Sequence, residues 1–345
     1  MSAEGPFLRA CRGQAVPYTP VWFMRQAGRY LPEYRAIRER ASLLEICRTP
    51  DLAAEVTLQP VERLGVDAAI LFADILLPFE PLGLGLSFAK GEGPVVARPI
   101  RSPADVARLP EVDPTESLGY VLEAARASRR ALDGRVPLIG FAGAPFTLAS
   151  YAIEGGGSRD FVTTKRFMYQ EPDAWHRLLD RLANLVGRYL AAQANAGAQA
   201  LQLFDSWVGC LSPDDYRQYV QPHSTTAVGI AAEGRVPIIH FGTGTSMLLE
   251  FMAQAGGDVI GVDWRISLDV AWSRLPGCGV QGNLDPAALL GPLPTLEAKV
   301  RDILRRAAGH SGHIFNLGHG VLQQTDPERL RAVVDLVHEE SATSV

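Results

Sequence analysis

The segment VPIIHFGTGTSMLLEFMAQAGGDVIGVD, residues 236–263, alternates between two kinds of pattern. Two short apolar runs, residues 236–241 and 258–263, enclose a longer stretch that is typical of a helix. Short runs rich in branched residues, separated by helical stretches, predict parallel strands joined by helical crossovers. This segment therefore predicts one strand–helix–strand unit of an α/β protein.

The same alternation extends over most of the chain. Eight apolar runs predict strands at residues 20–24, 68–72, 137–141, 200–204, 236–241, 258–263, 279–282 and 313–318. The predicted helices repeatedly begin with a capping residue followed by proline, and proline is favoured at the first helical position. These pairs are Thr49-Pro50, Ser102-Pro103, Ser212-Pro213, Asp285-Pro286 and Asp326-Pro327. With no low-complexity linker and no change in composition, eight strand–helix units predict a single closed (β/α)8 TIM barrel, and a doubly wound open sheet is the alternative.

Two segments of the predicted barrel interrupt the regular alternation. The long second connection, residues 74–135, predicts a hairpin around GLGLSFAKGEGPVV, and the glycines at 155–157 predict a flexible excursion after the third strand. Both segments could cover a cleft. In a barrel of this kind the connecting loops converge at the C-terminal ends of the strands, so we expect the active-site cleft there.

Composition and charge exclude several classes of function. The chain has 345 residues, 47% of them hydrophobic, and a net charge of −5 without any block of like charges. This balance argues against a protein that binds nucleic acid or a membrane surface through general charge neutralisation. The longest uncharged run, residues 136–153, contains two glycines and two prolines, so we expect a buried strand and turn there rather than a membrane span.

The cysteines and the N-terminus indicate the compartment. Four cysteines lie far apart in the sequence, with no C-x-x-C or H-x-C motif, so neither a disulfide framework nor a zinc site is predicted. The first residues contain an early acid and no apolar segment of the signal-peptide type. We therefore expect reduced thiols, no metal, and a cytoplasmic protein.

Polar residues follow the predicted strands, and their side chains are the candidates for the site. In chain order they are Arg25, Asp74, Tyr151 downstream of Gly143, Asp205 with Ser206, Gly242 with Thr243, Asp263 with Trp264, Asn283, and His319 between two glycines. A metal site in a barrel needs two or more converging His or carboxylate ligands, and only Asp74, Asp205, Asp263 and His319 could provide them.

The first of these loops is rich in arginine. The segment RQAGRYLPEYRAIRER holds five arginines against two acids, in a chain that is acidic overall. Arg25 and Arg29 precede Pro32, which should begin a helix, so both lie in a loop at the functional face, where guanidinium groups bind carboxylates bidentately. For Arg35 and Arg40 a solvated helix face is the better interpretation.

The other candidates each have a structural alternative. Asp74 ends an apolar strand and precedes ILLPF, so it is either a helix cap or a buried carboxylate that needs N–H groups or cations as partners. Tyr151 is equally well a core residue, Ser206 a turn residue, and His319 a structural histidine. No nucleophile with an adjacent base, no P-loop and no dinucleotide fingerprint is found. What remains is a pocket with arginines on one side and a carboxylate at its centre, which suits a large polyanion with N–H groups in its middle.

Eight motifs identify a family resemblance. They are FMRQAGRYLPEYR, LFADILLPFEPLG, GFAGAPFTLASYAIEGG, QLFDSWVG, HFGTGTS, VDWR, VQGNLDP and NLGHGVLQQTDPE. Together they resemble the uroporphyrinogen decarboxylase family from about residue 20 to the C-terminal helix. The resemblance implies one decarboxylase-like barrel domain over residues 1–345, working as a homodimer without cofactor or metal.

The resemblance also implies the reaction and the residues. The four acetate side chains of uroporphyrinogen III would be decarboxylated to methyl groups, giving coproporphyrinogen III and CO2 in haem or related tetrapyrrole biosynthesis. The family's motif residues fall on Arg25, Arg29 and Arg38 for substrate carboxylates, on Asp74 below the pyrrole N–H groups, and on Tyr151, Ser206 and His319 around the acetate and propionate arms. Asp74, Arg25 and Arg29 are the expected catalytic residues.

Two other functions fit parts of the pattern. Zinc-dependent methyltransferases that use corrinoid or folate share a related barrel but need thiolate and histidine ligands, and here His240 is followed by Phe241 and Gly242 rather than by an H-x-C motif. A non-catalytic tetrapyrrole carrier would use the same residues, bind the porphyrinogen and release no CO2.

Overall fold

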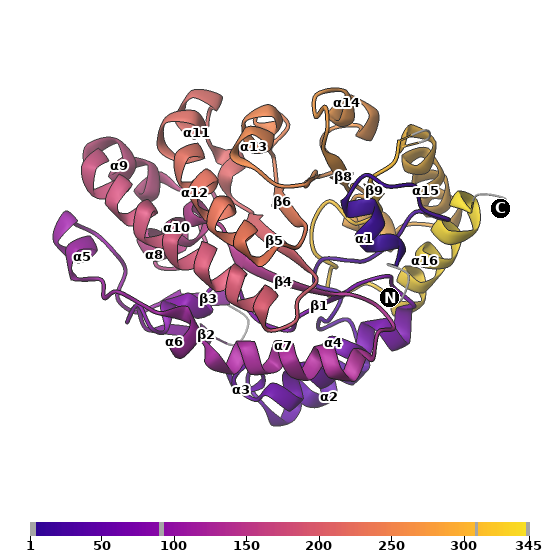
Figure 1. Ribbon diagram of the computed structural model, residues 1–345, viewed down its shortest axis with the longest axis horizontal. Coiled ribbons are helices and arrows are strands. Elements are labelled where there is room, and N and C mark those ends of the chain that lie inside the picture. Colours follow the sequence, from indigo (N-terminus) through magenta and orange to yellow (C-terminus); the bar gives the residue numbers. More distant parts are fainter. Residues whose placement is uncertain (1–4, 90–92, 308–309, 343–345) are drawn as a thin grey trace.

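A computed structural model describes residues 5–89, 93–307 and 310–342 of the chain. Within these residues a parallel sheet of seven strands forms in the order β1-β4-β5-β6-β7-β8-β9, and helices lie on its outer side (Figure 1). The strands are β1 (Ala69–Ile70), β4 (Leu138–Gly143), β5 (Ala200–Asp205), β6 (Ile238–Gly242), β7 (Val259–Gly261), β8 (Gly279–Gln281) and β9 (His313–Ile314).

The helices connect successive strands and cover the sheet. The α-helices are α1 (Pro6–Cys11), α2 (Pro32–Arg40), α3 (Leu43–Arg48), α4 (Pro50–Leu64), α5 (Pro103–Arg108), α6 (Pro114–Ser117), α7 (Gly119–Leu132), α8 (Pro145–Glu154), α9 (Val162–Gln170), α10 (Pro172–Asn195), α11 (Pro213–Tyr219), α12 (Gln221–Ala231), α13 (Leu249–Ala255), α14 (Leu268–Ser273), α15 (Leu293–Ala307) and α16 (Pro327–Ser341). Short 3-10 helices are η1 (Leu77–Phe79), η2 (Val208–Cys210), η3 (Ala232–Gly234) and η4 (Pro286–Leu290). No helix in the described part of the chain is both long and apolar enough to cross a membrane.

Seven of the eight predicted strands are confirmed, and they pair in parallel. Ile139 pairs with Ala200, Leu201 with Ile238, and Val259 with Gly279. The strands are almost wholly buried, as expected for a parallel sheet covered by helices.

The predicted first strand, residues 20–24, differs from the others. Only Val21 forms a bridge, a parallel one to Phe315 just beyond β9. The physical reason is the competition of side chains for its backbone N–H groups, because such groups otherwise donate to the neighbouring strand. Asp67 Oδ2 accepts from the N–H of Val21 at 2.7 Å, and Asn316 Oδ1 accepts from that of Met24 at 3.1 Å.

This irregular segment nevertheless lies between the two ends of the sheet. The N–H of Phe315 donates to the Pro20 carbonyl at 2.9 Å, and the N–H of Asp67, ahead of β1, donates to the Val21 carbonyl at 2.7 Å. On the opposite flank Thr19 donates to Ser341 Oγ in α16 at 2.8 Å. The segment therefore contacts both the beginning and the end of the sheet.

Side chains that meet across the sheet demonstrate its curvature. Trp22 Nε1 donates to Gln281 Oε1 at 2.9 Å, and Gln281 Nε2 donates to Gln202 Oε1 at 3.1 Å. Gln281 lies in β8 and Gln202 in β5, and β6 and β7 separate these strands in the sheet. Their side chains can meet only because the sheet curls toward its inner face.

The predicted helix starts are confirmed, with two local differences. Helices α5, α11 and α16 begin at the proline, and the preceding Ser102, Ser212 and Asp326 each accept a backbone N–H of the first turn. Asp285 caps a 3-10 helix instead of an α-helix. Thr49 precedes α4 without a side-chain cap bond, because its hydroxyl donates to the Glu45 carbonyl of α3.

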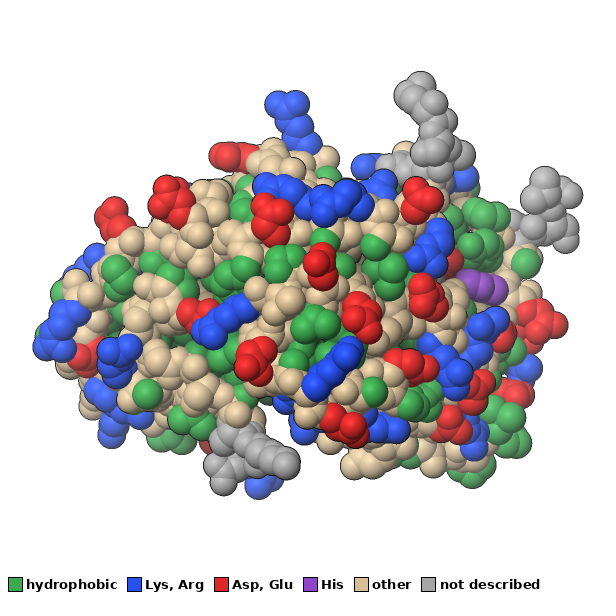
Figure 2. Space-filling view, turned by 90° about the horizontal axis from the view of Figure 1, so that it is seen from below, with side chains coloured by type: hydrophobic (Ala, Val, Ile, Leu, Met, Phe, Trp, Pro, Cys, Tyr) green, Lys and Arg blue, Asp and Glu red, His purple; other side chains and the backbone are tan. Residues whose placement is uncertain are grey.

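The two irregular segments pack against each other. The predicted hairpin is present as antiparallel β2 (Leu86–Ala89) and β3 (Gly93–Val96), while residues 90–92 of the predicted segment lie outside the described residues. Gly155 ends α8 in a left-handed conformation, and its carbonyl accepts from the N–H of Val96 at 2.9 Å. The predicted excursion at residues 155–157 thus contacts the hairpin directly. On the face seen from below, acidic and basic side chains are interspersed, as expected from the balanced composition (Figure 2).

Candidate active site

Several candidate residues lie at the C-terminal edge of the sheet. Asp74 follows β1, Ser206 directly follows β5, and Asp263 follows β7. Parallel strands place their C-terminal ends at the same edge, so residues far apart in sequence meet there. Arg25 and His319 lie beyond the bridged residues Val21 and Phe315 at the same edge.

Asp74 is half-buried among apolar residues. Its Oδ1 accepts the N–H of Leu76 at 2.8 Å, just ahead of η1. The capping interpretation therefore accounts for one carboxylate oxygen, and within the described part of the chain no protein hydrogen bond reaches the other. Burial raises the pKa of Asp74, while the Leu76 N–H and the charge of Arg25 act in the opposite direction.

Arg25 has a strained backbone and an exposed side chain. Its φ angle is 59°, in the left-handed region that costs a residue with a Cβ atom roughly 1–3 kcal/mol. Its aliphatic stem lies directly over Gly320: a Cβ atom added to this glycine would lie 2.4 Å from Arg25 Cδ. The N–H of Val321 also donates to the Met24 carbonyl at 2.9 Å, which ties the two loops together.

His319 is held in one neutral tautomer. The N–H of Gly320 donates to its Nδ1 at 2.6 Å, so the ring proton lies on Nε2. Burial, together with the charges of Arg25 and Arg265 and opposed by that of Asp263, lowers the pKa of His319 to about 4. At neutral pH His319 is therefore an uncharged hydrogen-bond donor through Nε2.

Tyr151 and Trp207 form an aromatic wall beside this cluster. Tyr151 lies on α8, and its ring packs at 64° against Trp207 with 6.0 Å between centroids. Phe161 packs on Trp207 at 5.6 Å. Burial raises the pKa of Tyr151; Asp74 raises it and Arg25 lowers it, so both charges are electrostatic neighbours of the hydroxyl.

Arg29 and Arg38 lie just before α2 and on it. Arg29, in the loop predicted for it, donates through Nη2 and Nε to Gln323 at 2.8 and 3.3 Å when that amide presents its oxygen. Arg38, on α2, donates to the Ala41 carbonyl at 2.7 Å. The buried Tyr34 is an electrostatic neighbour of both arginines and of Asp74: its pKa is raised to about 12, mainly by burial, with Arg38 and Arg29 acting to lower it and Asp74 to raise it.

Arg35, Arg40 and Ser206 complete the set of polar residues considered from the sequence. Arg35 and Arg40 are exposed, as predicted, but Arg35 Nη1 also donates to the carbonyls of Arg29 and Tyr30 at 3.1 and 3.0 Å and so fixes the loop. Ser206 lies in a half-buried turn, where its carbonyl accepts from Thr243 Oγ1. It adjoins the aromatic wall through Trp207, and no described contact joins its side chain to Asp74 or Arg25.

Three residues of this arrangement were not among the sequence candidates for the site: Tyr34, Trp207 and Arg265. Asp263 is 2% exposed and pairs with Arg265. Asp263 itself was a sequence candidate, because it is a carboxylate directly after a predicted strand. Tyr34 and Ile37, three residues apart, form the ordinary buried face of α2. The sequence therefore does not distinguish Tyr34 as a site residue.

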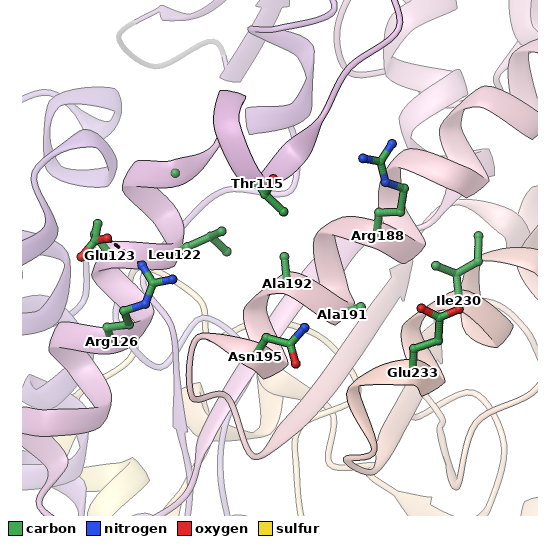
Figure 3. A pocket seen from close by; sticks show the side chains of 11 residues that line it. Thr115, Leu122, Glu123, Arg126, Arg188, Ala191, Ala192, Asn195, Ile230 and Glu233 are labelled. Atoms are coloured by element: carbon green, nitrogen blue, oxygen red, sulfur yellow. Dashed lines mark hydrogen bonds and ion pairs between the residues drawn. The ribbon is translucent and has the colours of Figure 1, made fainter.

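The described cavities lie elsewhere. One of about 390 Å³ is bounded by α7, α10 and α12 on the outer layer, with Arg126, Arg188 and Glu233 at its rim (Figure 3). Another of about 490 Å³ lies between α4 and α7. Neither is lined by a candidate residue, and the predicted cleft over the strand ends stays a prediction. Among the described residues, no group of three or more His, Cys, Asp or Glu is arranged to hold a metal ion.

Comparison with known proteins identifies relatives over nearly the whole chain. The family model for uroporphyrinogen decarboxylase (URO-D) matches residues 2–340. A uroporphyrinogen decarboxylase of Carboxydothermus hydrogenoformans is 56% identical over 98% of this chain and 97% of its own length. One from Sorangium cellulosum is 57% identical over 96% of this chain and 95% of its own. Among solved structures, a methyltransferase from Methanosarcina mazei has a TM-score of 0.80 at 20% identity, covering 96% of this chain and 97% of that one, which shows a shared fold alone.

Proposed function

The chain belongs to the uroporphyrinogen decarboxylase family, and we propose that it removes the four acetate carboxyl groups of uroporphyrinogen III, giving coproporphyrinogen III. It is thus a carboxy-lyase of tetrapyrrole biosynthesis. The observation in the structure that carries this proposal is Asp74, a half-buried carboxylate among apolar side chains with Arg25 as its electrostatic neighbour. Such a group stabilises positive charge that develops on a bound ligand.

The chemistry requires an electron sink. When the bond between an acetate CH2 and its carboxylate breaks, CO2 leaves and an electron pair stays on the carbon. A pyrrole protonated at a ring carbon accepts this pair as an iminium ion, a role that a bound cofactor has in other decarboxylases. The CH2 then takes up a proton and the ring returns its own, so one proton is consumed for each CO2 released.

Asp74 has two functions in this scheme. Its oxygen without a protein donor accepts the pyrrole N–H groups, and its negative charge stabilises the cationic ring that protonation produces. Because the other oxygen is held by the N–H of Leu76 at 2.8 Å, the carboxylate is oriented before the substrate binds.

The surrounding residues bind the carboxylate arms. Arg25, Arg29 and Arg38 bind them as forked donors, and neutral His319 donates through Nε2. Tyr151 and Ser206 line the acetate and propionate arms. Arginine is a poor general acid because its pKa lies above about 12, so the arginines orient substrate rather than supply the proton.

The barrel and its assembly complete the proposal. Residues 20–24 occupy the position of an eighth strand, between β9 and β1, and so close a (β/α)8 barrel. The contacts of Val21 with Phe315 and Asp67 support this interpretation. Residues 1–345 form one domain. The chain functions as a homodimer in the cytoplasm, for which the family resemblance and the isolated cysteines are the support; sedimentation velocity tests the dimer.

The decisive experiment is an anaerobic incubation of the purified protein with uroporphyrinogen III and a chelator, without added cofactor. Products are oxidised to porphyrins and their carboxyl groups counted. A decrease from eight carboxyls to four supports the proposal. Tight binding with all eight retained would identify a carrier, and activity lost with the chelator and restored by zinc would identify a metal-dependent enzyme.

A further inference from the structure

We propose that Arg265 is a further substrate-binding residue, which holds a carboxylate arm of the tetrapyrrole on the flank of His319 opposite Arg25. This inference rests on the proposed function. It adds a fourth cation to Arg25, Arg29 and Arg38 for a substrate that carries eight carboxylates.

The backbone that carries Arg265 is fixed from several directions. Asp263 accepts the N–H of Arg265 through Oδ1 at 3.0 Å and the N–H of Gly244 through Oδ2 at 2.7 Å. Asn283 Nδ2 donates to the carbonyls of Asp263 and Ile266, at 2.9 and 2.7 Å. The loop after β7 is therefore held by the loops after β6 and β8.

The guanidinium of Arg265 is held in place by its protein contacts and is still exposed enough to bind a ligand. Its Nη1 pairs with Asp263, and its carbon lies 4.3 Å from the centre of the Trp264 ring, a cation–π contact. The side chain is still 51% exposed. Since one nitrogen holds the protein carboxylate, and no described residue accepts from Nε or Nη2, that edge of the fork can bind a second carboxylate.

Two glycines place this loop and Arg25 on either side of His319. A Cβ atom on Gly318 would lie 2.7 Å from the Trp264 nitrogen and 2.9 Å from Asp263 Cα. A Cβ atom on Gly320 would lie 2.4 Å from Arg25 Cδ. His319 is thus flanked by two loops in close contact, each with an arginine that acts on its imidazole.

The charges of the two flanks are arranged alike. Arg25 neighbours the carboxylate of Asp74, and Arg265 pairs with that of Asp263. Asp263 already accepts two backbone N–H groups besides its ion pair, so its charge is compensated within the protein. An incoming carboxylate therefore meets the donors of Arg265 and the Nε2–H of His319.

The test compares Arg265→Gln with Arg274→Gln. Arg274 is the matched control because it pairs bidentately with Glu250, with both contacts at 2.6 Å, and lies at the end of α14. For Arg265→Gln we expect KM for uroporphyrinogen III to rise about 10- to 100-fold with kcat changed less than about 3-fold, the scale of one charge-assisted contact. Arg265→Lys, which keeps the charge and loses the fork, should fall between it and the unchanged protein.

A double variant separates binding from local structure. Arg265→Gln leaves Asp263 buried without its cation, whereas Asp263→Asn with Arg265→Gln removes both charges. A raised KM in the double variant supports the proposal, since the contact with substrate is still missing. A KM that returns to the unsubstituted value in the double variant, or that is unchanged in Arg265→Gln, overturns it. Absence of CO2 release by the unsubstituted protein would instead refute the proposed function.

Discussion

Substitution of Gly320 by alanine tests how precisely Arg25 must be placed. The added Cβ atom would lie 2.4 Å from Arg25 Cδ, 2.7 Å from Cγ and 3.1 Å from Cβ. Carbon atoms pack at about 3.5–4.0 Å, so the stem of Arg25 must move by about 1.1–1.6 Å. It cannot do so by rotating its tip alone, because the clash reaches down to the Cβ of a residue whose φ is already 59°.

A misplacement of about 1 Å in a group that orients substrate costs on the order of 100-fold in rate. We therefore expect Gly320→Ala to lower kcat/KM for uroporphyrinogen III by about 100-fold, in an anaerobic assay that measures initial CO2 release. The N–H of residue 320 remains, so its bond to His319 Nδ1 is retained and the effect is assigned to Arg25.

Gly229→Ala is the control for the substitution itself. Gly229 lies in α12 and has no atom within 4 Å of an added Cβ, so that variant should keep full activity. In Arg25→Ala with Gly320→Ala, the second substitution should add little, because the clashing stem is absent. A kcat/KM for Gly320→Ala within about 3-fold of the unsubstituted protein would show that activity does not depend on the present placement of the Arg25 side chain.

Two further results are expected. Asp74→Asn keeps an oxygen for the N–H of Leu76 but removes the charge, so kcat should fall by on the order of 100-fold or more with little change in thermal stability; near-normal turnover would exclude Asp74 from the chemistry. Burial lowers the pKa of His313 from 6.5 to about 4, so the unfolded chain binds a proton between these values that the folded chain does not. Stability should therefore fall as the pH is lowered from 6.5 toward 4, and urea unfolding at pH 7 and pH 5 should show a smaller loss for His313→Gln; equal losses would contradict this assignment.

The sequence predicted what depends on local pattern. Seven strands and the proline-initiated helices were found because burial on both faces and capping leave signals within a few residues. Residues 20–24 have the same apolar pattern as a strand, yet their N–H groups are taken by Asp67 and Asn316, which are 46 and 292 residues away from their partners. Such competition is a tertiary effect that no local pattern records.

For the site, Asp74 and Arg25 were identifiable because a charge directly after an apolar run is unusual. Arg265 was not, because an exposed arginine after VDW has the same pattern as a solvated one. Its significance comes from Gly318, which lets the Trp264 backbone approach within 2.7 Å of the position its Cβ would take. The glycines of NLGHG could be read from the sequence. Which residues pack closely against them, Trp264 at Gly318 and Arg25 at Gly320, could not.

The contact between Thr19 and Ser341 spans 322 residues, and it has a consequence for biosynthesis. A ribosome makes about 5–20 residues per second, so the first segment of the chain exists for roughly 15–60 s before its last partner is translated. During that time Val21 and its neighbours lack both β9 and α16. Along this edge the nascent chain therefore lacks its native partners until residues 313–341 have been translated.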